Sequence, residues 1–255
     1  MTKISPACLR VAQRCPAVAL TLLGSLGLVA CARGPAISKR VNDGHRVMAQ
    51  YETIACPLGG KIFSFRMDRF STAKGIALDM QPYGAEDLPW PLPQCPDNGF
   101  VLYKQKFSPA EIRRLRPLVK QQGFASKPVY ARAFLMARAL NEPLPLQLRL
   151  LQVAAWRGGD RYRQQALPVL ARLLKERTQT ERSQLDYLLL QAEYQRRLGR
   201  FAHAQQSVDM AAMAVPEVLE PLMPVLECQK TLIARKIRRA SPIPAEHARC
   251  GDPIS

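Results

Sequence analysis

The sequence lacks the short motifs that mark most catalytic sites. It contains no glycine-rich phosphate-binding loop, no HExxH zinc motif, no GxSxG nucleophile elbow and no paired CxxC. Histidine is also scarce, because only His45, His203 and His247 occur in 255 residues, far apart in the chain. A lone histidine on a helix is usually structural or solvated. We therefore predict a protein that is not an enzyme, with no catalytic residues, no metal and no cofactor.

Acidic residues are few relative to basic ones. The chain has 37 lysines and arginines against 20 aspartates and glutamates, a net charge of +17. Residues 1–30 contain three of the basic residues and no acidic one. Residues 31–255 therefore keep 34 basic and 20 acidic residues, a net charge of +14. Such a charge favours anionic partners: acidic proteins or peptides, anionic lipid, lipopolysaccharide, or nucleic acid. The alternative is a solvated surface that serves only solubility.

Long hydrophobic runs are missing as well. The apolar, uncharged run at residues 17–30 is shorter than the ~20 residues that a membrane-spanning helix needs. It follows Lys3, Arg10 and Arg14, and this order of charged and apolar segments is typical of a bacterial export signal. We therefore exclude a transmembrane helix here and predict that residues 1–30 are a signal peptide. Because an exported protein rarely meets nucleic acid, the signal disfavours that partner.

The run ends on Leu28, Val29, Ala30 and Cys31. This order resembles the lipobox of bacterial lipoproteins, which implies a lipid on the Cys31 sulfur and cleavage before it. Ala32 after the cysteine implies, in such proteins, anchoring in the outer membrane facing the periplasm. The alternative is that Ala30 and Ala32 mark an ordinary signal cleavage site, giving a soluble exported protein. Residues 31–50 then form a flexible tether.

Four cysteines remain after Cys31, namely Cys56, Cys95, Cys228 and Cys250. An even number in an exported chain suggests disulfides, and four cysteines allow three pairings. Proximity in sequence favours Cys56 with Cys95 and Cys228 with Cys250. The alternative for the first two is a pair of unrelated buried thiols.

Residues 51–107 are expected to form a small β module. Cys56-Pro57 and Cys95-Pro96 each begin a turn that reaches a glycine, followed by strands at 61–67 and 101–103. This arrangement resembles the paired knuckles of a zinc ribbon, in which four thiolates bind one metal. Gly59 and Asn98 stand where the second cysteine of each knuckle would be. We therefore predict a degenerate ribbon that holds a disulfide in place of zinc.

Between these turns lies a proline-rich loop, residues 81–93. Its prolines exclude a helix or a central strand, which leaves a rigid surface loop. Trp90 on this loop is a candidate contact for a partner. Glu86 and Asp87 could instead act as a hydrolase pair, although adjacent carboxylates are weak evidence for acid–base catalysis.

Helices are expected throughout residues 108–240. Ser108, Pro109 and Glu111 form a capping box with proline at the first helical position. Further helices are separated by breakers at Gly123, 141–145, 158–160, 179–180, Gly199 and Pro216. The last helical stretch is expected at 218–240, followed by a tail at 241–255 that is loose unless Cys250 ties it to Cys228.

One helix pair, residues 185–216, has a recognisable pattern. Small or apolar residues line both helices, and a glycine separates them: Leu185, Leu188, Leu189, Ala192, Gly199, Phe201, Ala204, Val208, Ala211 and Pro216. These spacings resemble a tetratricopeptide repeat, with Gln195 departing from the usual aromatic. The resemblance implies a helical-repeat domain. Cysteine-proline turns ahead of such helices also resemble an uncharacterised bacterial family with paired Cys-Pro-x-Cys-Gly knuckles.

A set of basic side chains near the C-terminus allows two interpretations. Arg235, Lys236, Arg238 and Arg239 form a basic cluster that could bind lipid phosphate or an acidic partner. They could equally complement the dipole at a helix C-terminus, which we favour slightly. Three methionines, Met80, Met210 and Met213, are expected to fill the core.

These observations together predict an envelope lipoprotein that acts as a non-enzymatic adaptor. A basic, concave surface of tetratricopeptide-like helices would bind an acidic protein or peptide. One alternative is a cell-wall-modifying enzyme centred on the 81–93 loop. Another, if the export signal is misinterpreted, is a cytoplasmic, zinc-ribbon-like nucleic-acid binder.

Overall fold

A computed structural model of the chain describes residues 50–67, 73–84, 90–176, 179–214, 216–245 and 248–254. The expected signal peptide, Cys31 and the tether up to residue 49 lie outside the described residues, as do Glu86 and Asp87. About half of the described residues are helical, and small two-stranded sheets precede the helices. The mainly helical class expected from the sequence is therefore confirmed. No helix in the described ranges is long and apolar enough to span a bilayer.

The β hairpins account for little of the chain. Strand β1 (Gln50–Ala55) pairs antiparallel with β2 (Ile62–Met67), and β3 (Gly75–Ile76) pairs with β4 (Pro82–Tyr83). The strand expected at 61–67 is confirmed. The one expected at 101–103 is wrong, since Val101 makes only an isolated bridge to Gln94. The segment opposite it contains prolines, which cannot donate to a ladder.

The helices follow in chain order. They are α1 (Pro109–Val119), α2 (Val129–Ala139), α3 (Leu144–Gly158), α4 (Asp160–Leu173), α5 (Glu181–Arg197), α6 (Phe201–Ala211), α7 (Pro216–Leu219) and α8 (Met223–Ala234), with a short 3-10 helix, η1 (Glu220–Leu222), before α8. The predicted capping box of α1 is confirmed. The Glu111 amide donates to Ser108 Oγ at 3.3 Å, and the Ser108 amide donates to Glu111 Oε2 at 2.8 Å.

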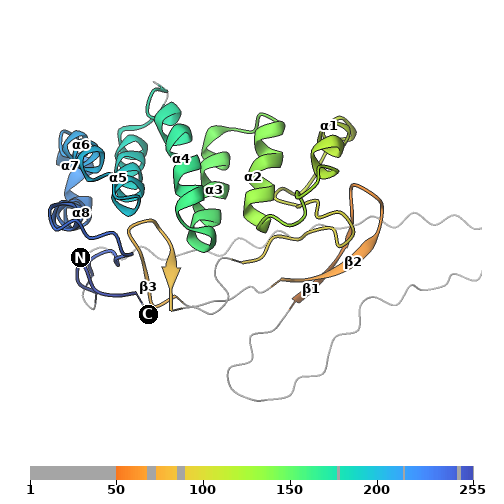
Figure 1. Ribbon diagram of the computed structural model, residues 1–255, viewed down its shortest axis with the longest axis horizontal. Helices are drawn as coiled ribbons and strands as arrows, with labels where there is room; N and C mark the ends of the chain where they lie inside the picture. The colour runs from red at the N-terminus through yellow and green to blue at the C-terminus, as the bar shows by residue number, and fades with distance from the viewer. Residues whose placement is uncertain are drawn as a thin grey trace, which may run out of the picture. The chain divides into compact units, whose positions relative to one another are not determined.

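Successive helices from α1 to α6 pack side by side, and α8 packs against both α5 and α6 (Figure 1). The turn between α5 and α6 contains Gly199 at φ +76°, a left-handed conformation that favours glycine. The predicted inner faces of this pair are buried: Leu185, Leu188, Leu189, Ala192, Ala204, Val208 and Ala211. Stacking of neighbouring helix pairs therefore provides the apolar cover that one pair could not supply alone.

The β segment and the first helices share one core. Cys56, Cys95 and Phe100 are buried together with residues of α1 to α4. Leu78, from the turn between β3 and β4, belongs instead to a second cluster with residues of α5, α6 and α8. The described part of residues 51–107 thus packs on both halves of the helical array.

Two expectations from the sequence need correction, one on the last helix and one on three methionines. The last helix ends at Ala234 rather than near residue 240, because Lys236 adopts a left-handed φ of +52° that stops it. Met80, Met210 and Met213 are not core residues, because their exposed fractions are 48%, 53% and 78%. All three lie at a turn or on the outer side of a helix end, where the neighbouring residues already fill the core.

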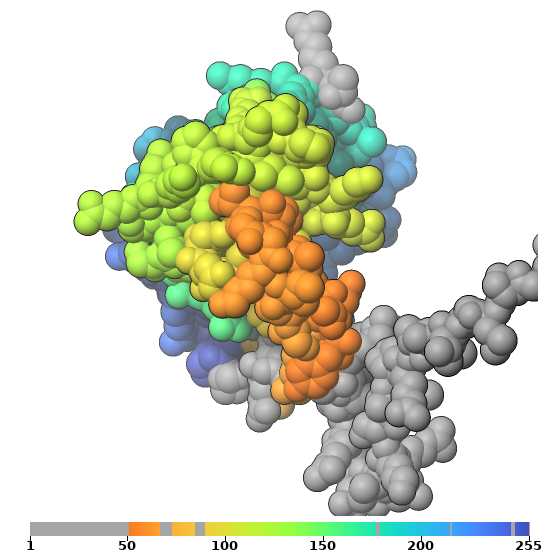
Figure 2. Space-filling model, turned by 90° about the vertical axis from the view of Figure 1, so that its right-hand side faces the viewer, coloured from red at the N-terminus to blue at the C-terminus, as the bar shows by residue number. Residues whose placement is uncertain are grey.

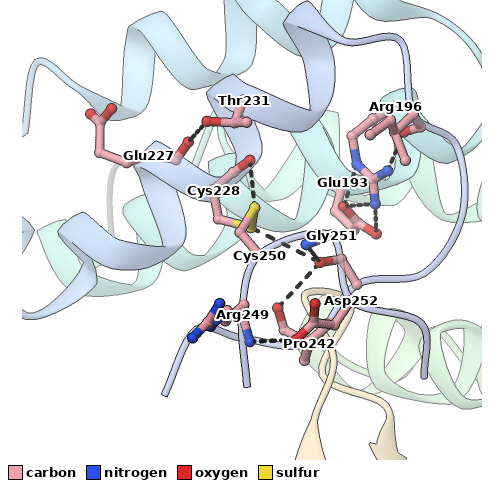
Figure 3. The surroundings of a disulfide bond; sticks show 12 residues. Glu193, Arg196, Glu227, Cys228, Thr231, Pro242, Arg249, Cys250, Gly251 and Asp252 are labelled. Atoms are coloured by element: carbon pink, nitrogen blue, oxygen red, sulfur yellow. Dashed lines mark hydrogen bonds and ion pairs between the residues drawn. A yellow bond between two sulfur atoms is a disulfide. The ribbon is translucent and has the colours of Figure 1, made fainter. Parts of the chain in front are cut away.

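Both favoured disulfide pairs are confirmed. The Cα atoms are 5.5 Å apart in Cys56–Cys95 and 5.4 Å apart in Cys228–Cys250. The second bond ties the C-terminal segment to α8, and Figure 3 shows its surroundings. There the Gly251 amide donates to Ser241 Oγ at 2.8 Å. The tail is therefore attached to the helical body up to the disulfide.

A buried charge cluster joins the β3–β4 turn to the helices. Asp79 is fully buried, and its backbone carbonyl accepts hydrogen bonds from Gln152 Nε2 at 2.9 Å and Trp156 Nε1 at 3.1 Å. Its carboxylate lies 3.8 Å from Arg163 and 3.6 Å from Arg197. Residues from α3, α4 and α5 thus hold one turn that is distant in sequence.

Glu193 and Arg196 extend this cluster toward the C-terminal segment. The two side chains are buried and paired, with Arg196 Nη2 2.6 Å from Glu193 Oε1. Arg196 Nη1 also donates to the carbonyl of Ile237 and, at 3.0 Å, to that of Arg239. The guanidinium therefore fixes the path of the chain after α8.

Removing the disulfides should destabilise the protein, and the longer closed loop should cost slightly more. The bonds close loops of 39 and 22 residues. On the chain-entropy view, the Cys56→Ala/Cys95→Ala variant should lose about 4 kcal/mol and Cys228→Ala/Cys250→Ala about 3 kcal/mol of unfolding free energy. Urea unfolding followed by circular dichroism measures both. Equal stability of either variant and the parent would contradict the cross-linking role.

Glu193 should make stability depend on pH. Burial raises the pKa of Glu193 from 4.5 to about 7, although the Arg196 guanidinium opposes this. The folded state therefore binds a proton that the unfolded state releases, so stability should fall as pH rises between these values, by on the order of 3 kcal/mol. The Glu193→Gln variant should show a flatter profile in unfolding titrations. Parallel profiles for the parent and this variant would contradict the assignment.

Candidate binding groove

The clearest concave surface lies between the β1–β2 hairpin, the proline-rich segment and the start of α2. It is a hollow of about 730 Å³, open to solvent. Its walls combine aromatic, aliphatic and charged side chains: Glu52, Ile54, Phe65, Arg66, Trp90, Pro91, Leu92, Pro93, Leu102, Tyr103, Lys104, Gln105 and Tyr130. We refer to this surface as the aromatic groove. Figure 2 views the end of the molecule that the β1–β2 hairpin (orange) and α1 form.

The hairpin register explains one wall of the groove. Glu52 lies opposite Phe65, and Ile54 lies opposite Phe63. Because side chains alternate along a strand and opposite residues share a face, these four side chains project from one side of the hairpin. Phe63 packs on the core, while Ile54 and Phe65 line the groove.

The proline-rich segment forms the opposite wall. Trp90 is 41% exposed, and its carbonyl accepts a short hydrogen bond from the Tyr130 hydroxyl at the start of α2. Pro91 and Pro93 keep the backbone extended after it. Trp90 is exposed, as the sequence indicated.

Lys104 fixes the third side of the groove. Its Nζ lies 2.6 Å from both Glu111 and Glu142, and the Tyr103 hydroxyl donates to Glu142 at 3.2 Å. Burial and the nearby Glu142 raise the pKa of Tyr103, which therefore stays protonated. Burial alone would lower the pKa of Lys104, but its hydrogen bonds to the two carboxylates outweigh this and raise it. Lys104 is thus a charged, immobilised wall residue.

Two arginines of α3 act on the Tyr130 side of the groove. Burial raises the pKa of Tyr130, and the charges of Arg149 and Arg157 oppose this shift. The Arg149 guanidinium also lies 5.3 Å from the centre of the Trp156 ring. The groove lining therefore carries charges of both signs, with Arg66 and Lys104 as cations and Glu52 as a carboxylate.

The Cys56–Cys95 disulfide lies beside this surface and joins two turns of matching geometry. In each, the cysteine amide donates to the carbonyl five residues later at 2.8 Å, and the glycine amide four residues later donates back to the cysteine carbonyl at 3.0 Å. Gly60 and Gly99 have similar φ values of +73° and +71°. The Asn98 amide joins the turns by donating to the Leu58 carbonyl at 2.5 Å.

The basic cluster after α8 is largely used within the fold. Arg238 donates to the Arg197 carbonyl at 2.9 Å and pairs with Asp160 at 3.1 Å. Arg239 donates to the Gly251 carbonyl at 2.6 Å. Arg235, at the helix cap, and Lys236 are exposed. The structure does not bring this cluster to the aromatic groove, whose lining contains none of its four residues.

A second basic surface was not identified from the sequence. Five exposed cations lie on α1 or beside it: Lys106, Arg113, Arg114, Arg116 and Lys120. None of them pairs with a described acidic side chain. The spacing of Arg113, Arg116 and Lys120 matches one helical face and could have revealed it.

The described residues contain no group of three or more metal-binding side chains. His203 is exposed on α6. Within the groove, Glu52 is the only carboxylate among the described lining residues, so acid–base catalysis by a carboxylate pair finds no support there. The arrangement is suited to binding. Comparisons with protein-family models, curated proteins and solved structures give no match.

Replacing Lys104 should cost more than replacing its neighbour Lys106. Lys104→Ala leaves two partly buried carboxylates close together without their cation, whereas Lys106 is exposed. We expect a loss of about 1–2 kcal/mol for Lys104→Ala, because charge-assisted hydrogen bonds of a partly exposed group are lost. Lys106→Ala should be within about 0.5 kcal/mol of the parent in urea unfolding. Equal effects would show that Lys104 does not brace the groove.

Proposed function

We propose that this chain is a non-enzymatic binding protein whose aromatic groove takes an extended, acidic segment of a partner protein. The observation that carries this is the groove itself, in which Trp90, Tyr103 and Tyr130 line an open hollow. Aromatic-lined grooves suit extended peptides that contain proline or other apolar side chains. Arg66 in the lining, and Arg149 and Arg157 near Tyr130, favour acidic residues beside them.

The proposed location is the bacterial cell envelope, with a lipid on Cys31 and the chain facing the periplasm. The lipobox-like sequence supports the anchor, and two disulfides suit an oxidising compartment. Labelling of the protein by fatty acid should disappear in Cys31→Ser.

The proposed architecture is a degenerate zinc ribbon followed by tetratricopeptide-like helices. The matched cysteine turns support the first part, and the buried faces and glycine turn of α5 and α6 support the second. With a disulfide between the two cysteines, no thiolate remains for a metal in the turns. Stoichiometric zinc in the purified protein would argue against this assignment.

Selection from a library of random short peptides tests the groove. Peptides bound by the full chain should be enriched in proline or aromatic residues flanked by acidic ones. Trp90→Ala should weaken the selected peptides by roughly tenfold or more, since a central aromatic often dominates an interface. Tyr51→Ala is the control, because Tyr51 is an aromatic residue on the β1–β2 hairpin that is 65% exposed yet does not line the groove. Failure to enrich peptides, or equal binding by Trp90→Ala, would overturn the proposal.

A further inference from the structure

The positive charge of this protein is concentrated in one part of the helical array. Residues 98–159, which include α1, α2 and α3, contain 11 lysines and arginines and 2 acids, a net charge of +9. The rest of residues 31–255 contains 23 basic and 18 acidic residues, a net charge of +5. The two acids of the basic stretch, Glu111 and Glu142, both lie 2.6 Å from Lys104 Nζ. One lysine therefore engages both acids, and no acid of this stretch neutralises its other cations.

Five of these other cations are exposed on α1 or beside it: Lys106, Arg113, Arg114, Arg116 and Lys120. Arg113, Arg116 and Lys120 are spaced by three and four residues, so they lie on one side of the helix. Leu115 and Val119, on the other side, are buried in the core. We refer to the five cations as the α1 basic face.

The exposed surface around these cations lacks apolar anchors. All of residues 105–123 are described, and their exposed members other than the five cations are glutamine, serine, proline, alanine and glycine. Protein–protein interfaces usually have a core of large aromatic or apolar side chains. A surface with many cations and no such core is suited instead to a diffuse layer of negative charge, which the headgroups of an anionic bilayer provide.

The position of α1 in the molecule leaves this face accessible from outside. Helix α1 lies at one end of the helix row (Figure 1), and Figure 2 views that end. The 18 residues between Cys31 and Gln50 can span at most about 65 Å. A lipid on Cys31 would therefore hold α1 within that range of a bilayer.

We propose that the α1 basic face binds the phosphate headgroups of an anionic bilayer. This inference rests on the proposed envelope location, which brings a bilayer close to the chain. Each lysine or arginine near an anionic surface adds attraction, and a basic patch is a common second signal beside a lipid anchor. The contact does not use the aromatic groove, whose described lining contains none of the five cations.

The distribution of the full chain between two vesicle populations tests this contact. The chain is diluted from mild detergent into a mixture of phosphatidylcholine vesicles and sucrose-loaded vesicles that also contain phosphatidylglycerol, and sedimentation separates the two. Any lipid on Cys31 can enter both populations, so the ratio reports the charge contact. The parent should favour the phosphatidylglycerol vesicles by ~10-fold or more at low salt, and high salt should reduce this preference because the charges are exposed.

Reversing two charges of the face should remove most of this preference. We expect Arg113→Glu/Arg114→Glu to lower the ratio by ~10-fold. The matched control is Arg172→Glu/Lys175→Glu at the end of α4, a helix that packs between α3 and α5. It makes the same change in net charge on exposed residues away from α1, and it should keep the preference of the parent.

Three results would overturn the proposal. One is an equal distribution of the parent between the two populations, and another is an equal loss of preference in the two charge-reversed variants, which would show that net charge alone decides. The third is a parent without vesicle preference that binds polyglutamate through Arg113 and Arg114, which would favour an acidic protein as the occupant. Failure of the proposed function is distinguishable, because neither Trp90→Ala nor a missing lipid on Cys31 should change the vesicle ratio.

Discussion

The buried charges around Asp79 constrain how the β3–β4 turn packs on the helices. The turn that carries Asp79 is held by Gln152 and Trp156 through its carbonyl and approached by Arg163 and Arg197 at its carboxylate. Such buried ion pairs contribute little net stability, because desolvation offsets their attraction, but an unpaired member is costly. The cluster therefore selects one arrangement of the β3–β4 turn on α3, α4 and α5.

At the other end of the molecule, contacts between segments distant in sequence hold the walls of the aromatic groove in place. The Cys56–Cys95 bond and the shared core hold the β1–β2 hairpin near α1 and α2, while Tyr130 holds the Trp90 segment. Lys104 is braced between Glu111 and Glu142. A groove whose walls are already ordered loses little conformational entropy when a peptide binds, which favours affinity.

Charge in this protein has separate uses in separate places. Arg163, Arg196 and Arg197 are internal and organise the fold, whereas the five cations on or beside α1 are exposed to solvent. The net charge of the chain does not distinguish these uses. A basic composition alone therefore says little about which surface meets a partner.

The sequence by itself determined the local features of this protein. The capping box at Ser108, the strand at 61–67, the turn at Gly199 and the buried faces of α5 and α6 follow from contacts within a few residues or one helical period. Nearness in the chain also favoured both disulfide pairs. Only the tertiary structure decided which exposed residues share a surface. Trp90 lines one groove together with Phe65 and Tyr130, Arg238 and Arg239 bind backbone carbonyls, and Met80, Met210 and Met213 remain exposed. These outcomes depend on contacts between segments far apart in the chain.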